Sequence, residues 1–385
     1  MSHLDRYILR QFFTNFVLVF AALFLFTCMI DLFINLDNFI EAADRTVSAR
    51  AGAGEGGALA RPLQTALYVC MFYAPQIFRF FVFFLGMATI SAMGFTLVQM
   101  HRNRELTAIL AAGVSLHRVA MPIILATVAL NVLQFINRES VLPALAPVLL
   151  MDQDDMGQRS VKEFRVNLLT DSQGRRIFAN RYNPDDETMR QVVIWEFGAD
   201  HELTRRITAD SAVWRSHAGA DGGIAGGQWD LINGVGTPIL RGANEPARGE
   251  PVSVIASDLD PTTILLHRYA EYRQMLSLTQ IGALMDKPGV YDASDLARIR
   301  FGRFAQFIVN ILALLITLPF FLLREPRNLV VQTVKCAAVG LSAQILGAMG
   351  VLVPLGALPA ATGVFLIPLL VLLPLAVAMQ AQVET

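Results

Sequence analysis

The sequence predicts an α-helical polytopic membrane protein with six transmembrane helices and an all-β domain inserted between the third and fourth helices. Three observations carry this prediction. The 385-residue chain is 54% hydrophobic and only 16% charged, whereas soluble domains average about 25% charged residues. Long charge-free apolar runs occur near both ends of the chain. Between them, short segments of strand-forming residues alternate with turn residues.

The apolar runs define the six predicted spans. A transmembrane helix needs about 20 apolar residues to cross the hydrocarbon layer. Runs of that size lie at 12–30, 80–100, 119–136 and 304–323. The last charge-free run, 336–383, suits two spans joined by a tight turn at the prolines of 354–359. An even number of spans puts both termini on one side, and the arginines of the short loops favour the cytoplasm.

Two charged residues lie near the outer ends of the first two spans. Asp31 follows the first apolar run, and Arg79 begins the second among several phenylalanines. An ionisable group inside a membrane suggests a functional role, but snorkelling to the interface is the alternative interpretation for both. The phenylalanine-rich surface is either packing against lipid or a wall for acyl chains.

A charged insert, HRNRELTAILAAGVSLHR, separates the second and third spans. Its spacing predicts a helix at about 101–116 that lies at the membrane surface. Its apolar and polar faces would be formed by Leu106, Ile109, Leu110 and Gly113 and by Arg104, Glu105 and Ala108. We expect Gly113 to end this helix and Ser115 to cap the next span. The insert either packs on its own spans or receives a separate, energy-supplying protein.

The sequence excludes several kinds of chemistry. The glycine-rich segment AGAGEGGA at 51–58 lacks the Gly-Lys-Ser/Thr of a phosphate-binding loop, and no lysine precedes Ser or Thr. The chain is therefore not expected to hydrolyse ATP itself or to bind a cofactor. The three cysteines, Cys28, Cys70 and Cys336, and the histidines of the inserted domain have no metal-ligand spacing. No nucleophile–base arrangement predicts an enzyme, and the net charge of −1 gives no sign of nucleic-acid binding.

The inserted domain is expected at 138–270, between a first membrane part at 1–137 and a last one at 301–385. Its short strands are separated by Gly, Asp, Asn and Pro turns and include ELTRRITA (202–209) and DSAVWRS (210–216) as two separate strands. They predict an antiparallel sandwich or roll. An amphipathic connector at 271–300 follows, with one helix at 273–285 and another from Ala293 into the fourth span. Arg298, Arg300 and Arg303 lie there, either to bind lipid head groups or to anchor the chain at the interface.

Five segments in this order resemble a known family. They are LDRYILRQFF (4–13), APQIFRFFVFFLG (74–86), RELTAILAAGVS (104–115), ITADSAVW (207–214) and QWDLING (228–234). Together with the three closing spans, they resemble the LptF/LptG (YjgP/YjgQ) permeases of the lipopolysaccharide export ABC transporter. The opening LDRYI is more similar to the LptG side.

The resemblance implies a fold, partners and a function. The inserted domain would be a periplasmic β-jellyroll. The chain would pair with a second LptF/LptG-like permease in the inner membrane and bind an LptB-like ATPase dimer in the cytoplasm, which uses the ATP. A single-span LptC-like subunit and a periplasmic bridge protein are further implied partners. The insert would be the coupling helix, with Glu105 contacting the ATPase and Arg104, Leu106, Ala112 and Gly113 shaping that contact.

One segment departs from the family pattern. These permeases tend to place lysines near the outer end of the first span, to meet lipid A phosphates, but here IDLFINLDNFIEAAD (30–44) is acidic. Arginines would have to substitute, and the expected substrate-cavity residues are Phe33, Arg79, Phe80, Phe84, Arg298, Arg303 and Phe307. The expected function is extraction of lipopolysaccharide or a related glycolipid from the inner membrane and its transfer to a periplasmic bridge. The alternatives are another envelope lipid or a lipoprotein as cargo, or a membrane-anchored scaffold without transport.

Overall fold

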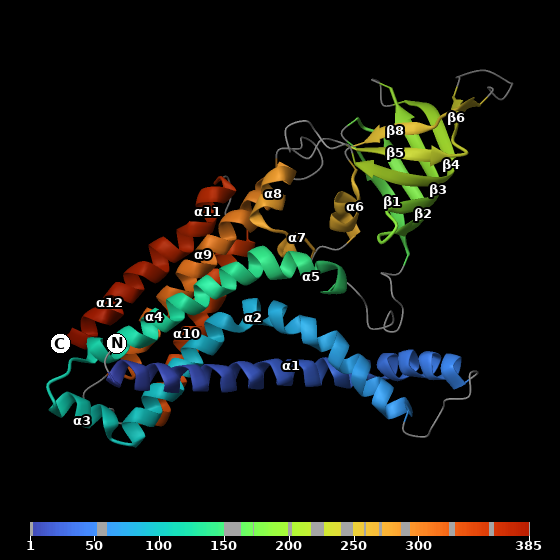
Figure 1. Ribbon diagram of the computed structural model, residues 1–385. Helices are drawn as coiled ribbons and strands as arrows, with labels where there is room; N and C mark the ends of the chain where they lie inside the picture. Colours follow the sequence, from blue (N-terminus) through green and yellow to red (C-terminus); the bar gives the residue numbers. More distant parts are fainter. Residues whose placement is uncertain are drawn as a thin grey trace. The chain divides into compact units, whose positions relative to one another are not determined.

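The computed structural model divides the chain into two compact units (Figure 1). The membrane unit comprises Met1–Leu36, Cys70–Ala144 and Ser294–Thr385, and the β unit comprises Asp37–Val69 and Leu145–Ala293. The structure describes residues 3–51, 60–149, 163–171, 173–198, 202–216, 227–239, 249–257, 259–268, 272–285, 293–322, 328–353 and 358–384. Most of the glycine-rich segment 51–58 and the centre of the proline turn lie outside these residues and stay predictions.

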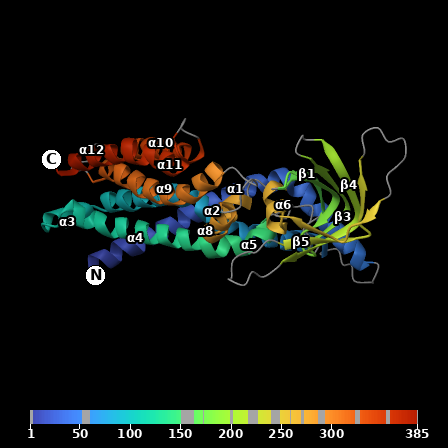
Figure 2. The same cartoon turned by 90° about the horizontal axis from the view of Figure 1, so that it is seen from above.

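Six helices of the described chain are long and apolar enough to cross a membrane, which confirms the predicted number. They are α1 (His3–Ala51), α2 (Ala60–Arg102), α4 (Leu116–Ile136), α9 (Ala293–Thr317), α10 (Leu329–Leu352), and α11 (Ala360–Ile367) continued by α12 (Leu373–Glu384). A π-helical turn, Pro368–Leu372, joins α11 to α12. α10 packs beside α11 (Figure 2).

α10 begins earlier than the charge-free run predicted. The Asn328 side chain caps it, because Oδ1 accepts hydrogen bonds from the backbone amides of Val330 at 3.1 Å and Val331 at 3.4 Å. Lys335 therefore lies inside this helix.

The boundary predicted at residue 138 is wrong, because α4 continues as helix beyond it. A π-helical turn, Asn137–Val141, leads directly into α5 (Leu142–Leu149), and the first strand begins only at Phe164. The charged residues of the turn do not end the helix, since Glu139 pairs with Arg303 of α9 at 3.5 Å.

The core of the membrane unit is built mainly from α2, α4 and α9. In their most apolar stretches, 61% of α2, 50% of α4 and 61% of α9 is buried, against only 6% of α1 and 17% of α10. α1 joins the core through its first turns, where Ile8, Phe12 and Phe16 are buried with Leu106 and Leu116. The rest of α1 and much of α10 expose apolar side chains.

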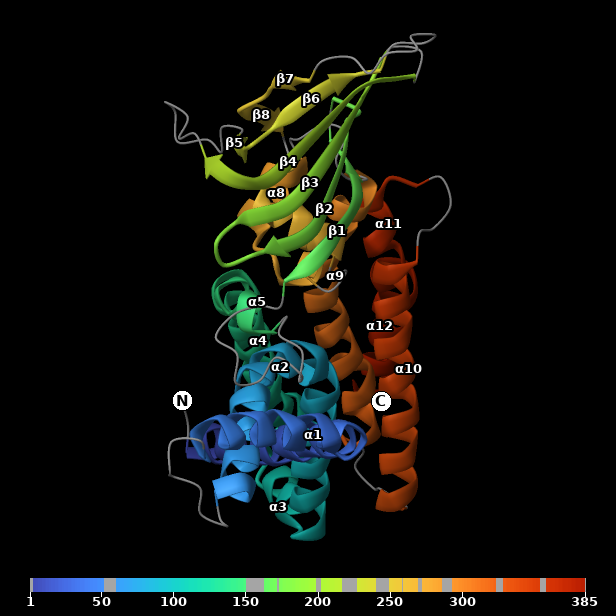
Figure 3. The ribbon, with the colours of Figure 1, turned by 90° about the vertical axis from the view of Figure 1, so that its right-hand side faces the viewer.

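The β unit contains an antiparallel sheet of eight described strands, which confirms the predicted all-β insertion (Figure 3). The strands are β1 (Phe164–Thr170), β2 (Arg176–Asn183), β3 (Thr188–Phe197), β4 (Leu203–Ser216), β5 (Gly227–Ile232), β6 (Val235–Pro238), β7 (Glu250–Pro251) and β8 (Val254–Ser257). Their order is β1-β2-β3-β4-β5-β8, and β6 pairs with β4 and β7. The sequence predicted two strands where β4 forms one, because its first half pairs with β6 and its second half with β5.

Alternating side chains of these strands form the core of the β unit. Trp229 is 1% exposed, and its indole Nε1 donates a hydrogen bond to the Leu259 carbonyl at 2.9 Å. Trp214 packs against it with ring centroids 5.1 Å apart. Three short helices follow, namely α6 (Pro261–Arg268), α7 (Tyr272–Met275) and α8 (Leu278–Met285). The single connector helix predicted at 273–285 is thus divided between α7 and α8.

Candidate functional site

The predicted surface helix is present as α3 (Glu105–Ala111), shorter than the expected 101–116. Gly113 ends it as predicted. Its φ of +80° is left-handed, and its backbone amide bonds the Leu110 carbonyl at 2.9 Å while the Val114 amide bonds the Ile109 carbonyl at 3.3 Å. This pair of bonds is the Schellman motif. Ser115 occupies the N-cap position of α4, but its side chain makes no capping hydrogen bond.

Three of the four residues predicted for the apolar face of α3 pack inward, and the fourth, Gly113, is exposed. Leu106 is 1% exposed and is buried in the core of the membrane unit, where Ile109 and Leu110 pack against the same cluster. Ala112 and Gly113 are exposed. Leu106 therefore anchors α3 in the membrane unit and would shape a partner contact only by holding this helix in place. The exposed small residues leave a face on which another protein can approach closely.

Glu105 begins α3, and neutral donors hold both oxygens of its carboxylate. The Tyr7 hydroxyl donates to Oε2 at 2.8 Å, and the Asn103 side-chain amide donates to Oε1 at 3.1 Å. Glu105 forms no ion pair with any residue that the structure describes, so its negative charge is available to a cation from outside. Arg104, just before it, is exposed and has a left-handed φ of 59°.

Two further contacts tie the α2–α4 connection to the membrane unit. Arg118 at the start of α4 pairs with Asp5 of α1, with Nη2 and Oδ2 3.1 Å apart. His101 Nε2 lies 2.6 Å from the Phe321 carbonyl, beyond the end of α9. Tyr7, Asp5 and these partners were not predicted from the sequence. The only signal was that Asp5 and Tyr7 belong to the LDRY segment that carries the family resemblance.

Only some of the cavity residues expected on α1 and α2 contact one another. Arg79 lies over the Phe80 ring at 5.7 Å from its centroid, and Phe80 stacks on Phe84 at 5.5 Å. Phe24 of α1 meets Phe80 edge-on at 5.7 Å, so these rings fill the seam between α1 and α2. Phe33 is 87% exposed on α1.

The expected residues of α9 form a second group. Arg303 is only 3% exposed at its side chain and pairs with Glu139. Arg298 pairs with Asp295 of the same helix at 3.7 Å, and Phe307 is half-buried. Because carboxylates already accompany both arginines, neither is a free cation for a lipid phosphate. The next candidate is Arg138, which has no hydrogen bond or ion pair within the described residues.

Polar side chains that the sequence analysis missed link α4 to α9 inside the membrane unit. Asn310 of α9 donates to Asn131 at 2.8 Å and accepts from Gln306 at 3.0 Å. Gln134 donates to the Val82 carbonyl of α2 at 2.7 Å. The sequence contains a pattern that could have revealed these amides. Two pairs of amide side chains lie at helical spacing within apolar runs, namely Asn131 with Gln134 and Gln306 with Asn310. Such amides join helices where no water is available.

The acidic Asp31 is held between α1 and α2. The Tyr73 hydroxyl of α2 donates to Asp31 Oδ2 at 2.6 Å, and the Asn35 side chain donates to the Asp31 carboxylate at 2.9 Å. Asn35 has non-helical dihedral angles, with φ −114° and ψ 16°, so α1 bends here. Among the residues that the structure describes, no three His, Cys, Asp or Glu side chains are grouped as metal ligands.

Comparison with known proteins places this arrangement in a family. A family model described as "Lipopolysaccharide export system permease LptF/LptG" matches residues 58–380, and a comparison with curated proteins finds no match. The match spans the membrane helices from α2 onward and the β insertion, and α1 lies before it. It covers LptF and LptG together, so it does not choose between them. The chain therefore belongs to the LptF/LptG family of lipopolysaccharide export permeases, which are transport subunits and not enzymes.

Proposed function

We propose that this permease extracts lipopolysaccharide or a related glycolipid from the inner membrane and passes it through its periplasmic β domain to a bridge protein. The energy would come from ATP hydrolysed by a separate LptB-like ATPase dimer that docks on α3. The chain itself would bind no cofactor. The observation that carries this proposal is Glu105, a carboxylate on the connection between two spans that has only neutral partners among the described residues.

The surroundings of α3 support a cytoplasmic location. Both termini lie at the same end of the membrane unit as α3 (Figure 1). Five arginines belong to this end, namely Arg6, Arg10, Arg102, Arg104 and Arg118. Basic residues in short loops favour the cytoplasmic side. We therefore propose that both termini are cytoplasmic and that the β domain is periplasmic.

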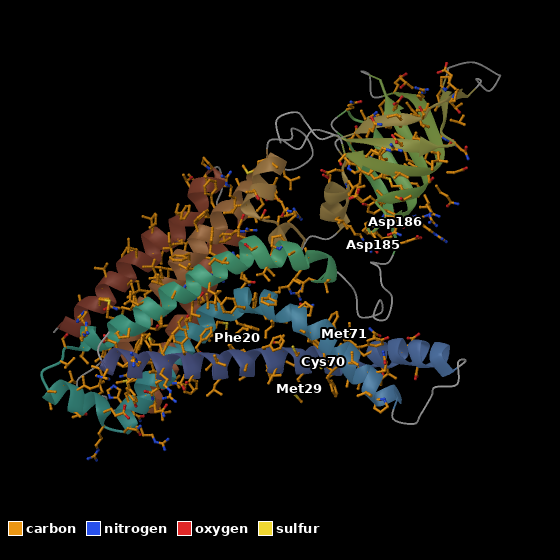
Figure 4. All side chains as sticks on the ribbon, in the orientation of Figure 1. Phe20, Met29, Cys70, Met71, Asp185 and Asp186 are labelled. Carbon is orange, nitrogen blue, oxygen red and sulfur yellow. The ribbon has the colours of Figure 1, made fainter. Side chains whose placement is uncertain are left out.

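The exposed spans support pairing with a second LptF/LptG-like permease. α1 and α10 are hardly buried within this chain. Their exposed side chains are large and apolar, for example Phe26 at 64%, Met29 at 72% and Ile345 at 60%, and Met29 faces away from α2 (Figure 4). Some of this surface meets lipid tails, and the partner permease and a single-span LptC-like subunit would cover the rest.

Arg138, which has no ion pair among the described residues, is the cation we propose for the lipid phosphates. Arg298 and Arg303 are paired with carboxylates, and Asp31 makes the outer end of α1 acidic. The same acidity favours one alternative, a less anionic envelope lipid as cargo. Native mass spectrometry of the purified complex separates the two, because a retained lipid with two phosphates supports lipopolysaccharide and a neutral or zwitterionic lipid supports the alternative.

The variant Glu105→Arg tests the docking of the ATPase. Reversing the charge should repel the partner's cation, so lipid export and lipid-stimulated ATP hydrolysis should both be abolished while the protein still inserts in the membrane. Export is measured in cells or proteoliposomes that contain the complete complex. Asp185→Arg, the same change on an exposed turn of the β unit (Figure 4), is the control and should export normally. Normal export by Glu105→Arg would contradict the proposal that the ATPase docks through Glu105.

A further inference from the structure

We infer that the first turn of α1 is part of the site where energy enters the permease, and that Tyr7 positions Glu105 and passes its displacement to α1. This inference rests on the proposed function, because it takes Glu105 as the residue that the ATPase moves. It adds a positioning residue to the coupling contact and names the span that would move with it.

The Tyr7–Glu105 hydrogen bond connects two distant parts of the chain. The hydroxyl and the carboxylate oxygen are 2.8 Å apart, and hydrogen bonds to an ionised acceptor are stronger than neutral ones. Asn103 holds the other oxygen at 3.1 Å. The two donors together fix the direction of the carboxylate without cancelling its charge. A partner's cation that pulls on Glu105 therefore also pulls on Tyr7.

A second contact holds the same turn of α1 from another side. Asp5 is 9% exposed and pairs with Arg118 at the start of α4. Residues two apart in a helix do not share a face, so Asp5 and Tyr7 point to different neighbours. The first turn of α1 thus contacts both the start of α3 and the start of α4, near the two ends of the connection between α2 and α4.

Apolar packing makes this end of α1 move with α3. Ile8 and Phe12 are fully buried, and they share one cluster with Leu106 of α3, which is 1% exposed. Further along, α1 is held by separate contacts, such as the Asn15 amide donating to Thr96 at 2.9 Å, while its outer face stays exposed. A shift at the first turn would therefore be transmitted along a stiff helix as far as the bend at Asn35.

The inference is tested with Tyr7→Phe, which removes only the hydroxyl from a side chain that is 45% exposed. The complete complex, with its ATPase and partner permease, is reconstituted in proteoliposomes that contain lipopolysaccharide. ATP hydrolysis and lipid export are measured on the same samples. We expect hydrolysis close to wild type but about tenfold less lipid exported per ATP, which corresponds to about 1.4 kcal/mol of lost coupling. An unchanged export-to-ATP ratio overturns the inference.

Thr14→Val is the matched control, because it also removes a hydroxyl from α1. Thr14 donates to the Arg10 carbonyl of its own helix at 2.8 Å and does not link α1 to α3. It should leave the export-to-ATP ratio unchanged. A loss as large as that of Tyr7→Phe would mean that α1 is merely sensitive to substitution, and it would also overturn the inference.

Glu105→Gln separates this inference from the proposed function. If Glu105→Gln exports normally, the proposed docking site fails and the inference fails with it. If Glu105→Gln is inactive but Tyr7→Phe keeps the wild-type ratio, the inference alone fails.

A distance measurement gives a readout that a loss of stability would not imitate. Spin labels are placed at Met29 of α1 and Ile345 of α10, which are exposed, in a variant without the native cysteines. We expect the label distance to change when the complex is trapped with ATP and vanadate, and Tyr7→Phe to abolish that change while the resting distance stays the same. A change of equal size in Tyr7→Phe contradicts the inference.

Discussion

Among single residues, Arg303 and Glu139 explain how a charged turn continues a membrane helix. From the sequence, we predicted that the third span ends before Arg138, because charges in hydrocarbon are costly. The structure pairs the next residue, Glu139, with an arginine of a distant helix. Sequence spacing cannot reveal such a pair. The same holds for Leu106 and Tyr7 at α3. The pattern predicted an apolar face, but it did not show that Leu106 would be buried or that Tyr7 would bond Glu105.

The Arg303–Glu139 ion pair predicts a large loss of stability for Glu139→Gln. Arg303 is 3% exposed at its side chain, and removing one partner of a buried ion pair costs roughly 3–5 kcal/mol. The variant should show a clearly lower midpoint of thermal unfolding in detergent. Asp295→Asn makes the same change in the Arg298 pair, where the carboxylate is 49% exposed, and should cost less than about 1 kcal/mol. Equal losses would show that Glu139 does not compensate a buried charge.

Among whole elements, the apolar runs and the Gly113 signal were enough to predict six spans and a surface helix that ends at Gly113. The strands of the insertion were also predictable from turn residues. The elements that were wrong needed tertiary information. α4 continues into α5 because α9 supplies a counter-charge, and β4 stays one strand because two different strands pair with its two halves. The membrane amides were visible as residues, but their partners were not.

From the hydrogen bonds between side-chain amides of α4 and α9, we predict that Asn310 holds these two helices together. Replacing it with Leu removes its bonds to Asn131 and Gln306, and we expect a loss of about 0.6–2 kcal/mol, as for other hydrogen bonds between membrane helices. Thermal unfolding in a double-mutant cycle with Asn131→Leu measures the pair directly. The second substitution should cost less when the first is already present. Strictly additive losses would show that the two amides do not act together.

As a whole molecule, this chain is a multi-pass permease of the inner membrane whose family acts within an ABC transporter complex. Its own residues suggest how the work is divided. α2, α4 and α9 form a packed core, α1 and α10 are left exposed, and α3 presents a carboxylate and small residues. The central claim is that energy from a separate ATPase enters at α3.

Site-specific photo-cross-linking in membranes tests that claim most directly. A photoreactive residue is placed at Ala108 or Ala112, which are exposed on α3, and for comparison at Leu341, which is 42% exposed on α10. The account predicts that both α3 positions cross-link to a co-purified ATPase subunit and that Leu341 does not. Cross-linking of the ATPase at Leu341, or none at either α3 position in a complex that still exports lipid, would contradict it.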